Sequence, residues 1–108
     1  MIAEPTIAKV VELLRQAAPD ATVILFGSYA RGDASEGSDL DFLVVEPEVK
    51  DCFEEMVRLN DVLRPIEAPV DVLVTSQKDF DYWADTPGTV YYEAVAEGKT
   101  FEAPSRVR

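Results

Sequence analysis

Hydrophobic side chains recur every three or four positions at the start of the chain, and this spacing predicts an amphipathic helix. The helix is expected to begin near Pro5 and to end before Pro19. Its hydrophobic positions are Ile7, Val10, Val11 and Leu14. A similar pattern predicts a helix over residues 51–64, and Thr86-Pro87 followed by a hydrophobic stretch predicts a last helix that ends at Gly98.

Short hydrophobic runs rich in β-branched residues lie between these segments and predict strands over residues 22–26, 39–45 and 70–74. Phe101 indicates a further short edge strand, and Thr75 or Ser76 is expected to cap a short helical turn. The order is helix, strand, strand, helix, strand, helix. It predicts an α/β (α+β) fold, with a small mixed sheet and helices mainly on one face.

The length and composition fit one small domain. The chain has 108 residues, of which 47% are hydrophobic, so we expect a single domain over residues 1–102 and a flexible tail over residues 103–108. Its hydrophobic runs are too short for a membrane span, and no secretion signal is visible at the N-terminus. Cys52 is the single cysteine, so an internal disulfide is excluded. We therefore expect a cytoplasmic protein that does not contact a membrane.

The numbers of charged residues and of histidines limit which kinds of partner and metal site are expected. With 21 acidic and 10 basic residues, the formal charge of −11 argues against direct nucleic-acid binding. It fits a basic protein partner, and the alternatives are simple solubility or a salt-rich cytoplasm. Because the chain has no histidine, it excludes histidine-ligated zinc and histidine acid–base catalysis. A metal would be held by oxygen atoms, which favours Mg²⁺ or Mn²⁺.

Residues 27–41 carry the clearest candidate chemistry. Gly27 and Ser28 form a tight turn after the first strand, where backbone N–H groups can face an anion. Asp39 and Asp41 open the second strand on one face, about 7 Å apart along the chain. Asp71 lies in the third strand, and if these strands are neighbours the three carboxylates converge. Divalent cations would resolve their repulsion, so the pattern favours a nucleoside triphosphate site with magnesium.

Each of these features also has a purely structural interpretation. Gly27-Ser28 alone is usually a turn, Asp39 and Asp41 alone are usually a solvated loop exit, and Asp71 alone fits an edge strand that resists aggregation. The joint pattern favours chemistry over these explanations.

Two further residues lie near the candidate phosphate turn. Arg31 either pairs with the phosphates or remains a surface charge. Ser38 is expected to cap or orient the loop before Asp39, and a direct phosphate contact is its second interpretation. The neighbouring Tyr29 is expected to pack rather than to take part in chemistry.

The spacing Gly27-Ser28-x10-Asp39-x-Asp41 resembles the signature of the polymerase-beta-like nucleotidyltransferase superfamily, and within it the minimal nucleotidyltransferases of bacteria and archaea. The resemblance covers nearly the whole chain. It implies a palm-like fold in which Gly27 and Ser28 bind the triphosphate of ATP. It also implies that Asp39 and Asp41 hold two metal ions and that Asp71 joins them and helps to deprotonate the attacking hydroxyl.

The chain has no room for the second domain that larger relatives use to hold an acceptor, so a partner is expected to complete the site. The resemblance implies an antitoxin that transfers AMP from ATP to a tyrosine of a small helical HEPN-domain RNase toxin. Two alternatives stay open: an antitoxin that neutralises its toxin by binding alone, and a small-molecule enzyme of the aminoglycoside-modifying type.

Overall fold

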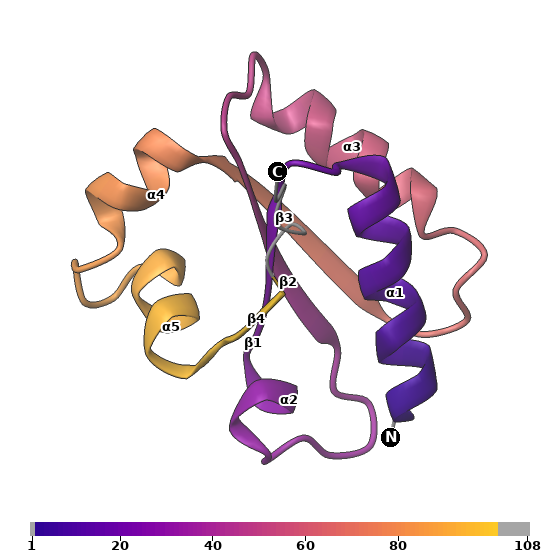
Figure 1. Ribbon diagram of the computed structural model, residues 1–108. Coiled ribbons are helices and arrows are strands. Elements are labelled where there is room, and N and C mark those ends of the chain that lie inside the picture. Colours follow the sequence, from indigo (N-terminus) through magenta and orange to yellow (C-terminus); the bar gives the residue numbers. More distant parts are fainter. Residues whose placement is uncertain (1, 102–108) are drawn as a thin grey trace, which may run out of the picture.

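The computed structural model describes residues 2–101, which form five helices and four strands (Figure 1). In chain order they are α1 (Glu4–Ala17), β1 (Thr22–Phe26), α2 (Ser28–Arg31), β2 (Leu40–Glu46), α3 (Cys52–Val62), β3 (Val70–Ser76), α4 (Gln77–Trp83), α5 (Val90–Glu97) and β4 (Lys99–Phe101). The predicted tail over residues 103–108 lies outside the described residues. Within the described part, no helix is long and apolar enough to cross a membrane.

The strands form one mixed sheet in the order β3-β2-β1-β4. β1 pairs antiparallel with both β2 and β4, whereas β2 and β3 run parallel. The parallel pair is possible because α3 provides the crossover between β2 and β3. This arrangement confirms the mixed sheet and the edge strand predicted at Phe101, and it brings β2 and β3 side by side.

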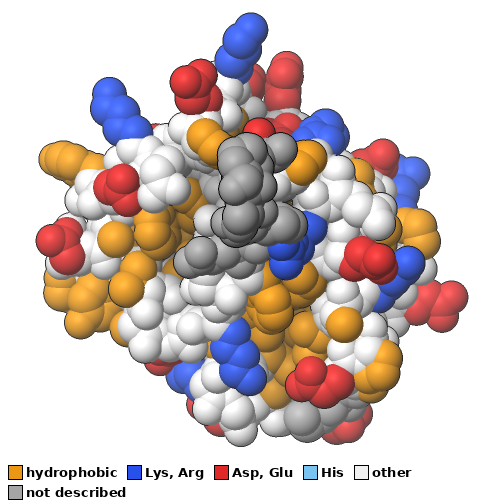
Figure 2. Space-filling model, viewed as in Figure 1, with side chains coloured by type: hydrophobic (Ala, Val, Ile, Leu, Met, Phe, Trp, Pro, Cys, Tyr) orange, Lys and Arg blue, Asp and Glu red, His pale blue; other side chains and the backbone are white. Residues whose placement is uncertain are grey.

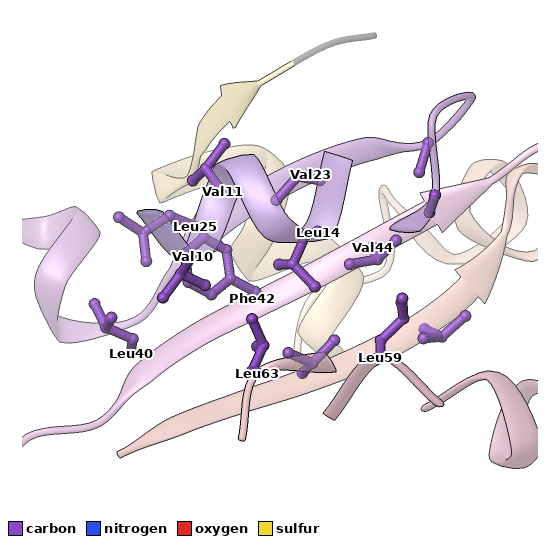
Figure 3. Close-up of a cluster of buried hydrophobic side chains, with 14 of the residues drawn as sticks. Val10, Val11, Leu14, Val23, Leu25, Leu40, Phe42, Val44, Leu59 and Leu63 are labelled. Atoms are coloured by element: carbon purple, nitrogen blue, oxygen red, sulfur yellow. The ribbon is translucent and has the colours of Figure 1, made fainter. Parts of the chain in front are cut away.

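One face of the sheet is covered by α1 and α3, the two longest helices (Figure 3). Val10 and Leu14 of α1 are fully buried and point toward Phe42 and Val44 of β2, with Leu59 of α3 beside them. Burying a large aliphatic side chain contributes roughly 1.5–3 kcal/mol, so this cluster is the main source of stability.

The opposite face is covered as well, by α4 and α5 (Figure 1). There Ile24, Phe26, Leu43 and Val45 meet Ala94 of α5 in a smaller cluster. The expectation of helices mainly on one face therefore holds for the longer helices, but it missed this second layer. The reason is that β1 and β2 are buried on both faces, so each face needs a cover.

The second layer leaves hydrophobic surface exposed, and Figure 2 shows orange side chains on the left of the view, over α4 and α5. The exposed large hydrophobic residues of α4 and α5 are Tyr82, Trp83, Tyr92 and Val95. Tyr82 and Trp83 pack edge-to-face, with ring centroids 4.9 Å apart.

Helix caps set most of the boundaries on this side of the molecule. Ser76 accepts a hydrogen bond from the backbone N–H of Asp79, as predicted, but α4 continues for seven residues rather than one turn. Thr89 caps α5, whose first residue is Val90. The last helix therefore begins later than the predicted Thr86-Pro87, because the Thr89 hydroxyl accepts from the N–H of Tyr92.

Candidate active site

The register of the sheet places the predicted aspartates together. Asp41 on β2 is paired with Asp71 on β3, and on its other side it is paired with Phe26, the last residue of β1. Neighbouring strands are about 4.8 Å apart, so the two carboxylates leave adjacent positions. Asp39 lies one residue before β2, which begins at Leu40 rather than at the predicted Asp39. We call these three residues the Asp41 cluster.

The Asp41 cluster is electrostatically strained around its central member. Burial raises the pKa of the Asp41 carboxyl, and the charges of Asp71 and Asp39 raise it further, whereas Arg31 lowers it. Asp39 and Asp71 are exposed, whereas Asp41 is half-buried. The cluster is thus a set of oxygen donors whose mutual repulsion an external cation would relieve.

Gly27 brings the backbone against Asp41. It has φ 79° and ψ −157°, a conformation that is open essentially to glycine alone. A Cβ atom at this position would lie 2.6 Å from Oδ2 of Asp41. Ser28, the first residue of α2, follows directly, so the turn predicted to hold phosphates does lie beside the carboxylates.

Arg31, the last residue of α2, is not a free surface charge. Its Nε donates to Oδ2 of Asp33 at 3.2 Å, and its Nη1 donates to Oε1 of Glu97 at 3.3 Å. These contacts with Asp33 and Glu97 raise the pKa of the guanidinium. Sequence reasoning missed Glu97, because it lies 66 positions away and no local signal links it to Arg31.

Ser38 takes part in the loop that leads to Asp39. Its Oγ accepts a hydrogen bond from the N–H of Ser35 at 2.9 Å, and its own N–H donates to the Ser35 carbonyl at 3.0 Å. These bonds match the predicted role in shaping the loop. Tyr29 packs against the larger core, and its hydroxyl accepts from the N–H of Ile2 at 2.7 Å, which agrees with a packing role.

The donor set fits a hard divalent cation, since carboxylate oxygens are the ligands that Mg²⁺ and Mn²⁺ prefer. Within residues 2–101 no three acidic, cysteine or histidine side chains are gathered closely enough to form a ready-made metal site. Mg²⁺ is commonly held by only one or two carboxylates, with water or phosphate oxygens as its other ligands.

Comparisons with known proteins agree with this geometry. The nucleotidyltransferase domain family matches residues 7–87. A Haemophilus influenzae protein named "probable protein adenylyltransferase MntA" is 34% identical over 103 residues, which cover 92% of this chain and 87% of the relative.

Two solved structures show the same fold. A toxin–antitoxin complex, MntA–HpeT, contains a chain that matches with a TM-score of 0.62 at 23% identity, covering 96% of this chain and 75% of that one. The complex of a tri-AMPylated Shewanella oneidensis HEPN toxin with its MNT antitoxin matches with a TM-score of 0.56 at 20% identity, covering 90% and 69%.

Proposed function

Because the chain belongs to the nucleotidyltransferase domain family, we propose that it transfers AMP from ATP to a tyrosine hydroxyl of a HEPN-type RNase toxin. The observation that carries this proposal is the pairing of Asp41 with Asp71 beside Gly27, where an added Cβ atom would lie 2.6 Å from Oδ2 of Asp41. The relative from Haemophilus influenzae is named as a protein adenylyltransferase, and the Shewanella oneidensis toxin carries AMP. Both support AMP as the transferred group and a toxin as its acceptor.

In this proposal each residue of the site has a distinct task. Gly27 and Ser28 bind the triphosphate, and Asp39, Asp41 and Asp71 hold two Mg²⁺ ions, with Mn²⁺ as a substitute. When bound, the ions neutralise charge on the phosphates and on the attacking oxygen. Arg31 lies one helical turn from Gly27 and is available to a phosphate, and Ser38 supports the loop of Asp39.

The reaction is a displacement at the α-phosphorus. The tyrosine oxygen forms a bond to this phosphorus while the bond to the bridging oxygen of the β-phosphate breaks, and pyrophosphate leaves. Asp71 accepts the proton of the hydroxyl, because its carboxylate is exposed and lies beside the half-buried Asp41 in the register of the sheet.

In this proposal the partner protein supplies the acceptor hydroxyl. A formal charge of −11 favours association with a basic, RNA-cutting protein through complementary charge. AMP on the toxin would add negative charge and bulk near its RNA site and oppose RNA binding. Use of ATP and a single free cysteine fit the cytoplasm as the place of action.

The test is direct transfer to the protein encoded beside this chain in its genome. The two purified proteins are incubated with ATP and Mg²⁺, and the intact mass of the partner is measured. We expect mass increments of one or more AMP groups, absent with Asp39→Asn or Asp41→Asn. A partner that is inhibited on binding but remains unmodified would instead identify a non-catalytic antitoxin.

A further inference from the structure

The ion pairs of Arg31 join parts of the chain that are distant in sequence. Asp33 belongs to the loop just after α2, whereas Glu97 is the last residue of α5. A guanidinium has five N–H donors. The two contacts use the Nε donor and one Nη1 donor, so they leave three N–H groups for another ligand. With its side chain 40% exposed, Arg31 is held in place and still open to solvent.

The position of Glu97 is itself fixed relative to the Gly27-Ser28 turn. The next residue, Gly98, packs so tightly that a Cβ atom there would collide with the carbonyl oxygen of Ala94 and lie 2.5 Å from Cγ2 of Ile24. Lys99 then pairs with Leu25 in the sheet. Because Ile24 and Leu25 belong to β1, which leads into Gly27, the end of α5 is anchored to the strand that carries the turn.

The charges nearby explain why Arg31 needs such an anchor. Its positive charge interacts with the negative charge of Asp41, so the Asp41 cluster attracts the guanidinium. Without other partners, the guanidinium of Arg31 would be drawn toward these carboxylates. Asp33 and Glu97 are the carboxylates that the guanidinium contacts instead.

We propose that Glu97 is a positioning residue, which holds the guanidinium of Arg31 beside the Gly27-Ser28 turn so that its remaining N–H groups meet a phosphate of the nucleoside triphosphate. The inference rests on the proposed function, and it adds a residue of α5 to the substrate site.

The test uses the full chain with its partner, ATP and Mg²⁺, and it measures binding of AMP-PNP as well as transfer. For Glu97→Gln we expect the KM for ATP and the Kd for AMP-PNP to rise about three- to fivefold, as for loss of an exposed charge contact. The kcat should change less. Glu93→Gln is the matched control, because Glu93 is an exposed glutamate one turn earlier on α5.

A double-mutant comparison separates positioning from general effects of charge. In an Arg31→Ala background, Glu97→Gln should have no further effect on KM or Kd, since the group that it positions is gone. An equal loss in both backgrounds would overturn the proposal, and so would tighter binding by Glu97→Gln, which would mean that Glu97 competes with the triphosphate for Arg31. Unchanged melting temperatures show that the variants are folded.

The two proposals fail in different ways. If the wild-type chain binds AMP-PNP and transfers AMP but Glu97→Gln behaves identically, only the role of Glu97 is wrong. If the wild type neither binds AMP-PNP with Mg²⁺ nor modifies its partner, the proposed function fails and the role of Glu97 is overturned with it.

Discussion

Strand β2 carries a carboxylate cluster at each end, and the two clusters differ in whether they contain a cation of their own. At its start lies the Asp41 cluster. At its end lies the Glu46 cluster, which consists of Glu46, Glu55 and Arg58. Within the second cluster Arg58 donates to both oxygens of Glu55, at 2.9 and 2.7 Å, and also to the Ala17 carbonyl at 3.0 Å. The cation is thus built into the cluster and ties α1 to α3.

Beside the Asp41 cluster, Arg31 lowers the pKa of Asp41 by its charge but is bound to Asp33 and Glu97 instead. Both clusters contain a carboxyl with a raised pKa, Asp41 and Glu46, and in both cases burial is the main cause. What distinguishes them is where the compensating charge comes from. A cluster with its own arginine holds the fold together, whereas a cluster that lacks one is prepared for charge from outside.

The largest effect should come from Asp41→Asn, which removes the central carboxylate of the Asp41 cluster. We expect transfer of AMP to fall at least about a hundredfold, since one electrostatic contact to the reacting phosphate is typically worth that much. The domain should stay folded, and its melting temperature in the absence of ligands should not fall, because like charges have been removed. Intact-mass spectrometry of the partner and thermal unfolding provide the two measurements.

The control is an equivalent loss of charge at a carboxylate that belongs to neither cluster. Glu54→Gln alters an exposed carboxylate of α3 outside both clusters and should leave transfer unchanged. If Asp41→Asn unfolds the protein, Asp41 is a structural residue and the distinction between the two clusters is wrong.

Much of this site could be predicted from the sequence because its signals are local. Gly27, Asp39 and Asp41 lie within a short segment, and the β-branched runs on either side predict the strands that hold them. Asp71 required only the assumption that β2 and β3 are neighbours, which their parallel register confirms.

Contacts between distant segments left no such signal. Glu97 meets Arg31 only because α5 returns to β1, and Glu46 meets Glu55 only because α3 packs beside β2. The packing of α4 and α5 on the second face of the sheet could not be predicted from the sequence pattern either. These helices are short and expose aromatic residues such as Tyr82, so their hydrophobic pattern does not show which side is buried. These features follow from tertiary packing, not from periodicity.

A second, smaller effect should follow from Gly27→Ala, which places a methyl group against the Asp41 cluster. The Cβ would lie 2.6 Å from Asp41 and the residue would keep a φ of +79°, so we expect a loss of about 2–3 kcal/mol in stability together with a loss of transfer. Gly37→Ala is the control, because Gly37 has a φ of +85° and no atom within 4 Å of the added Cβ. It should cost only about 1 kcal/mol and spare transfer. Equal melting temperatures for the two variants would show that the contact with Asp41 is unimportant.

The smallest effect concerns the contribution of the Glu46 cluster to stability, which depends on pH. Burial and the hydrogen bond to Glu55 raise the pKa of Glu46 from 4.5 to about 7, while Arg58 and Glu46 lower that of Glu55 to about 2. Between pH 4.5 and 7 the unfolded chain therefore releases the proton of Glu46 while the folded chain keeps it, so this residue costs stability as the pH rises through that range. Glu55 works in the opposite direction, and its contribution is lost only as the pH falls from about 4.5 toward 2.

Glu46→Gln removes the penalty without removing the hydrogen-bonding shape of the side chain. At pH 8 the variant should gain about 1 kcal/mol relative to the wild type, after allowance for solvent screening of a half-buried group, and at pH 4.5 it should gain almost nothing. Thermal unfolding of both proteins across this range measures the difference. Glu48→Gln, at an exposed glutamate two residues beyond β2, should show no such pH dependence. A constant difference between wild type and Glu46→Gln at all pH values would mean that Glu46 is ionised in the folded protein, and that Arg58 neutralises both glutamates of its cluster.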